Sequence, residues 1–187
     1  SLEEVKVTGD NGKNALFLTK DEGALYATNV SSTNDQGMLF LQGSNYGIHA
    51  NIGADGAAFG SLFLVGDVAG NAASTFTLEA GKNIFTTTVS LSKDNDVSNT
   101  LVLNAGSTIT GAIDTANANK GILSVKGDAT VTGAIGGTNA IDKVLFDTAG
   151  ATLTAATNNI VTANGVNFEA DATLKLTNDA HLDLGQA

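Results

Sequence analysis

Few side chains in this sequence belong to the types that carry out chemistry. The chain has two histidines, His49 and His181, and neither has a second histidine or a cysteine nearby in the sequence. We therefore expect both histidines at the surface or on the face of a strand, and not as metal ligands. Cysteine and arginine are both absent, since lysines account for all nine basic residues besides histidine. Disulfides and cysteine-ligated metals are thereby excluded.

Carboxylates are the remaining candidates for catalysis. Glycoside hydrolysis needs two of them on one face, and proton abstraction needs a basic group. Polysaccharide lyases of the β-helical kind commonly use arginine, which this chain lacks. Seven aspartates lie in contexts typical of turns, where their side chains cap the backbone: Asp55, Asp67, Asp94, Asp96, Asp114, Asp128 and Asp142. The sequence therefore predicts no catalytic residues, and a carbohydrate-active enzyme is kept as the second functional hypothesis.

Two short motifs also have a chemical interpretation. Asp94-Asn95-Asp96 could offer oxygen ligands to calcium, but the Gly-Gly-x-Gly-x-Asp signature of calcium-binding solenoids is missing. Lys126-Gly127-Asp128 resembles short integrin-recognition tripeptides, although Gly-Asp is also ordinary turn chemistry. We interpret both motifs as solvated turns and predict no metal and no cofactor.

Threonines recur in the pattern Thr-x-Thr at 108/110, 130/132 and 152/154. Flat arrays of this kind are similar to those of ice-binding solenoids, which supplies a third hypothesis. Here the array covers three rungs and is replaced at 83–85 by Asn-Ile-Phe and at 173–175 by Thr-Leu-Lys. Because Thr–Thr pairs stabilise neighbouring strands by themselves, we interpret the array as structural.

The overall composition narrows the class of protein. Hydrophobic residues form 42% of the 187 residues, yet aromatics form only 5% and tryptophan is absent, as suits a narrow core. There are 22 glycines and no proline, which favours an uninterrupted hydrogen-bonded ladder with tight corners. A formal charge of −10 argues against binding nucleic acid or an anionic membrane. No apolar stretch approaches the length of a membrane-spanning helix, so we expect no direct membrane insertion.

Internal repetition is the main evidence for the fold. Residues 107–113, 129–135 and 151–157 align without a gap at an offset of 22 residues, as do Leu101, Leu123 and Leu145. A unit of this length cannot bury its own apolar face, whereas stacked units can. The sequence thus predicts an all-β chain, a parallel β-helix (solenoid) of about 22 residues per rung. An antiparallel sandwich is the alternative, but its strands rarely repeat in register.

Alternation along the strands predicts which side chains face the core. Ile109, Val131 and Leu153 should stack directly above one another, with the flanking threonines pointing outward. The predicted inward set is Leu101, Leu103, Ile109, Leu123, Val125, Val131, Leu145 and Leu153. Between about residues 66 and 100 the spacing is irregular, which predicts a bulge or a longer loop.

Three further segments carry a family resemblance: Asn51-Ile-Gly-Ala-Asp-Gly-Ala, Leu64-Val-Gly-Asp-Val-Ala-Gly, and Thr132-Gly-Ala-Ile-Gly-Gly-Thr-Asn-Ala. They resemble the passenger regions of Gram-negative autotransporters, particularly the rickettsial outer-membrane surface antigens, over about residues 38–187. The resemblance implies a right-handed β-helix exported to the cell surface, with roles in host-cell adhesion, invasion or a surface coat. The chain begins Ser-Leu-Glu-Glu, so we expect residues 1–187 to be a single β-helix segment excised from a larger passenger region.

Loops are the expected contact elements of such a segment, because loops vary freely while rungs must stack. We expect a host cell-surface protein or a second copy of the chain as partner, bound weakly and at many points. The predicted contact loops are the stretches around 94–99 and 117–120, and their candidate residues are Asp94, Asn95, Asp96, Asn99, Asn117, Asn119 and Lys120.

Overall fold

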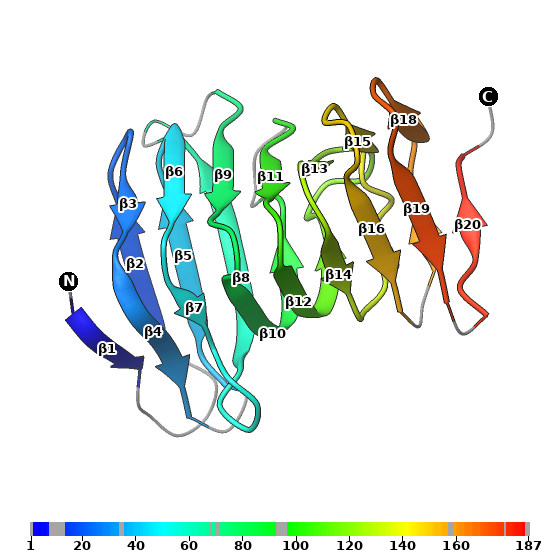
Figure 1. Cartoon of the computed structure of the whole chain (residues 1–187). Helices are drawn as coiled ribbons and strands as arrows, with labels where there is room; N and C mark the ends of the chain where they lie inside the picture. The colour runs from blue at the N-terminus through cyan, green and yellow to red at the C-terminus, as the bar shows by residue number, and fades with distance from the viewer. Residues whose placement is uncertain are drawn as a thin grey trace.

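The computed structural model is a rod of stacked β-strands (Figure 1). It describes residues 2–7, 14–33, 36–67, 69, 72–92, 97–156, 159–177 and 179–185. No helix forms in these ranges, so they contain none that is long and apolar enough to span a membrane. Every strand pair in them is parallel. The chain makes about seven turns of roughly 23 residues each, which confirms the predicted solenoid.

Strand pairing divides the solenoid into three faces. Face 1 consists of β1 (Leu2–Val7), β4 (Ala27–Ser32), β7 (Asn51–Ile52), the first part of β10 (Asn83–Ser90), the first part of β12 (Ser107–Asp114), β14 (Ala129–Val131), β16 (Thr152–Ala155) and β19 (Thr173–Leu176). Face 2 consists of β3 (Ala24–Leu25), β6 (Asn45–Ile48), β9 (Thr75–Leu78), β11 (Thr100–Leu103), β13 (Ile122–Val125), β15 (Lys143–Phe146) and β18 (Val166–Phe168).

Face 3 consists of β2 (Ala15–Thr19), β5 (Met38–Gln42), β8 (Phe59–Gly66), the second parts of β10 and β12, β17 (Ile160–Val161) and β20 (Leu182–Asp183). Ile135 connects its two halves through single bridges to Ile113 and Ile160. The register of β10 against β12 shifts between Phe85 and Thr88, where the strand passes from face 1 to face 3. This irregularity lies within the stretch for which the sequence predicted a bulge or a longer loop.

The core is a set of aliphatic columns that run along the rod. Seven of the eight residues predicted to face inward are completely buried, namely Leu101, Leu103, Ile109, Leu123, Val125, Val131 and Leu153. Thr108, Thr130 and Thr152 lie half-buried on the outer side of the same strands. The inward and outward registers were therefore predicted correctly on face 1, and the opposite register is excluded.

Two details of the predicted register are wrong. Leu145 lies half-buried on the outer side of β15, because Leu123 pairs with Val144 only 21 residues later, and Val144 and Phe146 fill the core instead. Leu153 stacks on Ala129, and not on Val131 as predicted. The corner between β15 and β16, residues 147–151, is two residues longer than the matching corner between β13 and β14, residues 126–128. A shift of two keeps Leu153 inward, because side chains alternate with period two.

Side chains on successive rungs also stack on the outer surface and at the corners. The rings of Phe17, Phe40 and Phe63 on face 3 lie parallel, with centroids 4.3 and 4.7 Å apart. On face 1, the Asn51 side chain donates to that of Asn29 at 3.4 Å and accepts from the Asn83 backbone amide at 2.9 Å. These contacts hold the register of the first rungs, where the sequence repeat is weakest.

The last rung leaves part of the core open to solvent. Its inward positions lie above completely buried Phe146 and Ile160, yet Phe168 is 52% exposed and Leu182 is 36% exposed. Leu176 and Leu184 are also exposed, at 37% and 45%. The strands of this rung therefore end the rod with apolar side chains that no further rung covers in the described residues.

Ile109→Asp should unfold the chain or destabilise it by roughly 3–5 kcal/mol, because an unpaired charge would enter a dry aliphatic column. Thr108→Asp, on the outer side of the same strand, should cost less than about 1 kcal/mol. Urea unfolding followed by circular dichroism measures both. Equal losses for the two variants would contradict the register described above.

Candidate functional site

The residues predicted to form contact loops have different positions in the structure. Asp94, Asn95 and Asp96 lie outside the described residues. Asn117, Asn119 and Lys120 belong to the loop that joins β12 to β13, where Asn119 is exposed and the other two are half-buried. This loop, residues 116–120, is the only one of the two predicted stretches whose contact surface can be described.

Asn99 is a correction to the predicted set, because it is completely buried. Its side-chain oxygen accepts a hydrogen bond from the Ser74 amide at 2.9 Å, and its side-chain nitrogen donates to the Leu64 carbonyl at 2.9 Å. Asn99 therefore satisfies backbone groups of two neighbouring segments and cannot reach a partner. Asparagine is frequent in exposed turns, and nothing in its local sequence distinguishes this buried role.

A second loop, residues 136–140 between β14 and β15, lies beside residues 116–120. The Asn119 amide donates to the Ala140 carbonyl at 2.7 Å. The Asn139 side chain donates to the Thr115 carbonyl at 2.9 Å. We call residues 116–120 and 136–140 the loop pair, because these bonds join them into one surface at the corner between faces 3 and 2.

Asp114 is the anchor of the loop pair. It lies at the end of β12, is only 8% exposed, and accepts three backbone hydrogen bonds. One carboxylate oxygen accepts from the amides of Thr115 and Asn139 at 2.8 and 2.9 Å, and the other accepts from the Thr138 amide at 2.9 Å. A carboxylate that accepts several amide bonds fixes the loop on both sides of it. The sequence indicates that Asp114 forms a turn, but not that it links two loops 20 residues apart.

Backbone conformation adds to the rigidity of the loop pair. Asn119 has φ of +65°, a left-handed conformation that asparagine tolerates better than most residues. Gly136 has φ of +71°, and a Cβ atom there would lie 2.1 Å from the Val161 carbonyl oxygen. Only glycine fits at position 136, so the start of the second loop is determined by its close approach to the next rung.

The outer surface of the loop pair is made of small and neutral polar side chains. Ala116, Ala118, Asn119, Gly137 and Thr138 are exposed. Lys120 is its only charged residue, in a chain whose formal charge is −10. The loop pair is thus a preorganised protrusion with a single charged residue on an acidic rod, and it has the character of a binding surface more than that of a reaction site.

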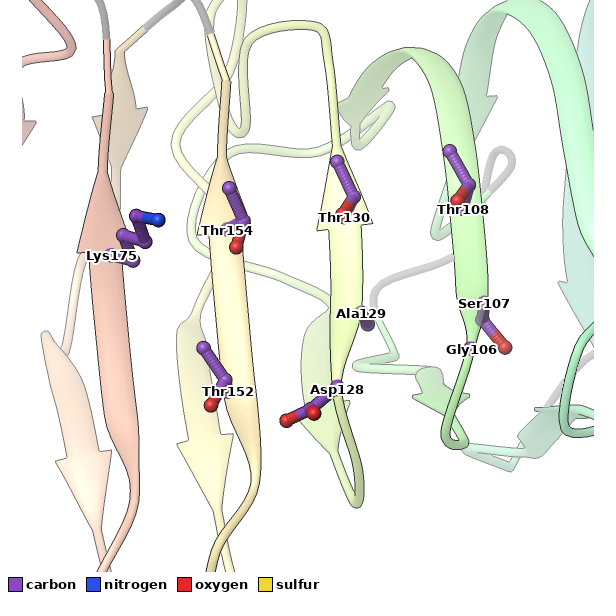
Figure 2. Close-up of a pocket in the computed structure, with 9 residues that line it drawn as sticks. All are labelled: Gly106, Ser107, Thr108, Asp128, Ala129, Thr130, Thr152, Thr154 and Lys175. Atoms are coloured by element: carbon purple, nitrogen blue, oxygen red, sulfur yellow. The ribbon is translucent and has the colours of Figure 1, made fainter.

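The hollows in the described surface are shallow, and two of the best formed lie on face 1. The first, shown in Figure 2, has a volume of about 280 Å³. Its lining residues come from successive rungs: Gly106, Ser107, Thr108, Asp128, Ala129, Thr130, Thr152, Thr154 and Lys175. A second, of about 240 Å³, lies beside Asp55 and Phe85. Each depression has a single carboxylate in its lining, so neither brings together the pair that glycoside hydrolysis needs.

The threonine array forms a column on face 1. Thr108, Thr130 and Thr154 pair across neighbouring strands, as Figure 2 shows. The column continues to Asn83 on one side and to Lys175 on the other. Only three rungs thus present threonine at this position, which is a small area for a surface that would bind ice.

Both histidines lie at the surface, as the sequence predicted. His49 stacks on Tyr26 with ring centroids 4.4 Å apart, and its Nδ1 atom lies 3.2 Å from a Glu79 carboxylate oxygen. His181 is exposed. In the described part of the chain, no three histidine or acidic side chains are grouped closely enough to hold a metal ion.

The fold defines this chain as a parallel β-solenoid. Comparisons with protein-family models, with curated proteins and with solved structures gave no match.

Asp114→Asn should loosen the loop pair while leaving the core intact. The amide that replaces one carboxylate oxygen cannot accept every bond that Asp114 accepts, which should cost about 1–3 kcal/mol. Hydrogen exchange of the Thr138 and Asn139 amides should become faster, and that of Val131 should not change. Unchanged exchange at both loop amides would show that the carboxylate does not hold the loop.

Calcium should not stabilise the chain, because the sequence around Asp94 and Asp96 lacks the signature of a calcium-binding solenoid. Thermal unfolding with millimolar calcium and with a chelator should give the same midpoint. A midpoint raised by calcium, and lost again in Asp94→Asn or Asp96→Asn, would contradict this expectation.

Proposed function

We propose that this chain is a non-catalytic, surface-exposed passenger segment of an autotransporter, which acts in host-cell adhesion or invasion or as a structural surface-layer antigen. The observation that carries the proposal is the loop pair, a rigid protrusion held on a regular rod by Asp114. A scaffold that fixes its loops loses little conformational entropy when those loops bind a partner.

The division between rungs and loops supports a binding role. Inward positions along the rungs are restricted to aliphatic and aromatic residues by the columns that they form, whereas the exposed positions of the loop pair, such as Ala118 and Thr138, can change without disturbing the stack. Variation in the loops then alters the partner without altering the scaffold. A surface antigen has this property, since its exposed loops change while its fold persists.

The chemistry of the surface favours weak contacts at many points. The loop pair has none of the tyrosine, tryptophan or arginine residues that dominate tight interfaces. Attachment through such surfaces becomes strong when many copies act together. This mode suits a protein displayed densely on the outside of a cell, and a host cell-surface protein is the proposed partner.

The non-catalytic part of the proposal is supported by the shape and chemistry of face 1. Its two depressions are open, and the lining of each contains one carboxylate and no histidine. The assignment to autotransporter passengers is supported by the Gly/Ala/Thr/Asn motifs at 51–57, 64–70 and 132–140 together with the parallel solenoid. Localisation on the extracellular side of the outer membrane is part of the same proposal.

Replacing residues 117–120 by a Gly/Ser turn of equal length should reduce attachment of protein-coated beads to host cells several-fold, because it removes half of the loop pair. The replacement should leave the melting temperature within a few degrees of the original, since the core columns are unchanged. Bead counts per cell, at matched protein density, measure the effect.

A matched control replaces residues 147–150, an exposed turn at the corner between β15 and β16, in the same way. This variant should attach as the unaltered chain does. The proposal would be refuted if both loop variants attached as well as the unaltered chain, while a single substitution of Asp128 in the face 1 depression abolished attachment. That result would favour a carbohydrate-binding groove.

A further inference from the structure

The second depression on face 1, of about 240 Å³, is lined by three segments of the chain. They are the turn that follows β7, the part of β10 where its register shifts, and β12. Asp55 and Gly56 come from the turn, Phe85 and Thr87 from β10, and Thr110 from β12. All of these segments lie outside the loop pair, so the depression is a separate part of the surface.

Phe85 contributes an aromatic ring that has no ring partner. The other partly exposed rings each stack on a neighbour, namely Phe17, Tyr26, Phe63 and Phe168. Phe85 is half-buried and stacks on no other ring in the described residues. Its neighbour on the preceding rung is Gly53, where a Cβ atom would lie 2.3 Å from the Phe85 carbonyl oxygen. This close approach requires glycine, so no side chain covers Phe85 from that rung.

The polar side chains around Phe85 are not used by the fold. The Asp55 carboxylate is exposed and forms no hydrogen bond or ion pair within the part of the chain that the structure describes. The hydroxyls of Thr87 and Thr110 likewise have no hydrogen-bond partner there. The depression therefore offers one charged acceptor, together with two hydroxyls that can both donate and accept.

The backbone on both sides of the depression is held in place. The ends of the turn 54–57 exchange two backbone hydrogen bonds, at 2.9 and 3.4 Å, which close the turn that carries Asp55. Across the depression, a Cβ atom at Gly111 would lie 1.8 Å from the Thr86 carbonyl oxygen, so the irregular part of β10 fits tightly against β12. Irregularities of this kind direct side chains outward, and Thr87 is exposed there. The side chains are thus placed before any ligand arrives.

We propose that this depression binds one neutral pyranose residue of a glycan. A pyranose carries C–H groups on its faces, which the negative face of an aromatic ring attracts, and hydroxyls at its edge, which a carboxylate and threonine hydroxyls bind. The volume of about 240 Å³ is below the roughly 300–1,000 Å³ of pockets that enclose a drug-sized ligand, so it suits a single sugar residue whose neighbours stay in solvent. Because the lining has one carboxylate, the sugar is bound and not cleaved.

Charge narrows the choice of ligand. Asp55 is the charged residue of the lining, which contains no lysine or histidine, so an acidic sugar or a phosphate is repelled. An ammonium group is the competing ligand, because it is attracted both by a carboxylate and by an aromatic face. Sites that select ammonium groups surround them with several rings, whereas this depression has one ring and two free hydroxyls. The hydroxyls favour the sugar.

NMR titration of the ¹⁵N-labelled chain tests the proposal. The probes are the methyl glycosides of glucose, galactose, mannose and N-acetylglucosamine, at up to about 50 mM, since a contact of this size should have a Kd on the order of 1–10 mM. At least one glycoside should shift the amide signals of Gly56, Thr87 and Thr110. The amides of Asn119 and Thr138 in the loop pair should not move.

Two substitutions test the contacts. Phe85→Ala should raise the Kd more than about tenfold, and Asp55→Asn should raise it about three- to tenfold. Phe17→Ala removes a ring that is 61% exposed on face 3, and Asp128→Asn removes the carboxylate of the other depression on face 1. These two controls should bind as the unaltered chain does. Melting temperatures show whether each variant keeps its fold.

The proposal is overturned if no glycoside shifts these amides, or if the shifts persist in folded Phe85→Ala. Should Phe85→Ala lose its fold, Asp55→Asn decides, because Asp55 lies in an exposed turn, and an unchanged Kd would then overturn the proposal. Choline chloride is the second probe. Larger shifts with choline than with every glycoside would assign the depression to an ammonium ligand and also overturn it. Bead attachment is not measured here, so this proposal and the function proposed for the loop pair can fail independently.

Discussion

The rest of the structure depends on one constraint: a position that faces inward on one rung must face inward on the next. Each rung is a thin layer that cannot bury its apolar side chains alone, so the rungs above and below supply its core. When one turn of the chain is longer or shorter than the next by an even number of residues, the same side chains still face inward. When the difference is odd, the other set of alternating side chains faces inward instead. The rung that leads to β15 shows the second solution, since Val144 and Phe146 take the inward positions that Leu145 leaves.

Polar side chains at the corners also depend on neighbouring rungs for their partners. Asn99 and Asp114 are both buried or nearly so, and each accepts or donates bonds to backbone groups of other segments. Corners between parallel strands cannot satisfy all of their amides and carbonyls within one rung. Asparagine and aspartate side chains complete these bonds, and in doing so they decide which loops are fixed and which surfaces they present. The binding surface at the corner of faces 3 and 2 is therefore a product of how the rungs are joined.

The sequence predicted the parallel solenoid because a repeat of 22 residues is visible between residues 101 and 157. It could not resolve the register around β15, because Val144, Leu145 and Phe146 are all apolar and alternation cannot choose between them. The two-residue shift at Leu153 was hidden for a related reason, since Thr-x-Thr looks the same after a shift of two. Asn99 was misassigned, and the role of Asp114 was missed, because their partners lie about one rung away and leave no local pattern.

The stacked rings of Phe17, Phe40 and Phe63 have a consequence for how the rod loses its structure. They give the first rungs of face 3 a stack of three rings outside the core, whereas Phe146 and Phe168 form a single ring pair on face 2. Cohesion along the rod is therefore unequal, and the layers that hold the three rings should separate later than layers of face 3 that lack them. A molecule built in this way can lose some layers while those around the rings keep their shape, so partial damage does not become general collapse.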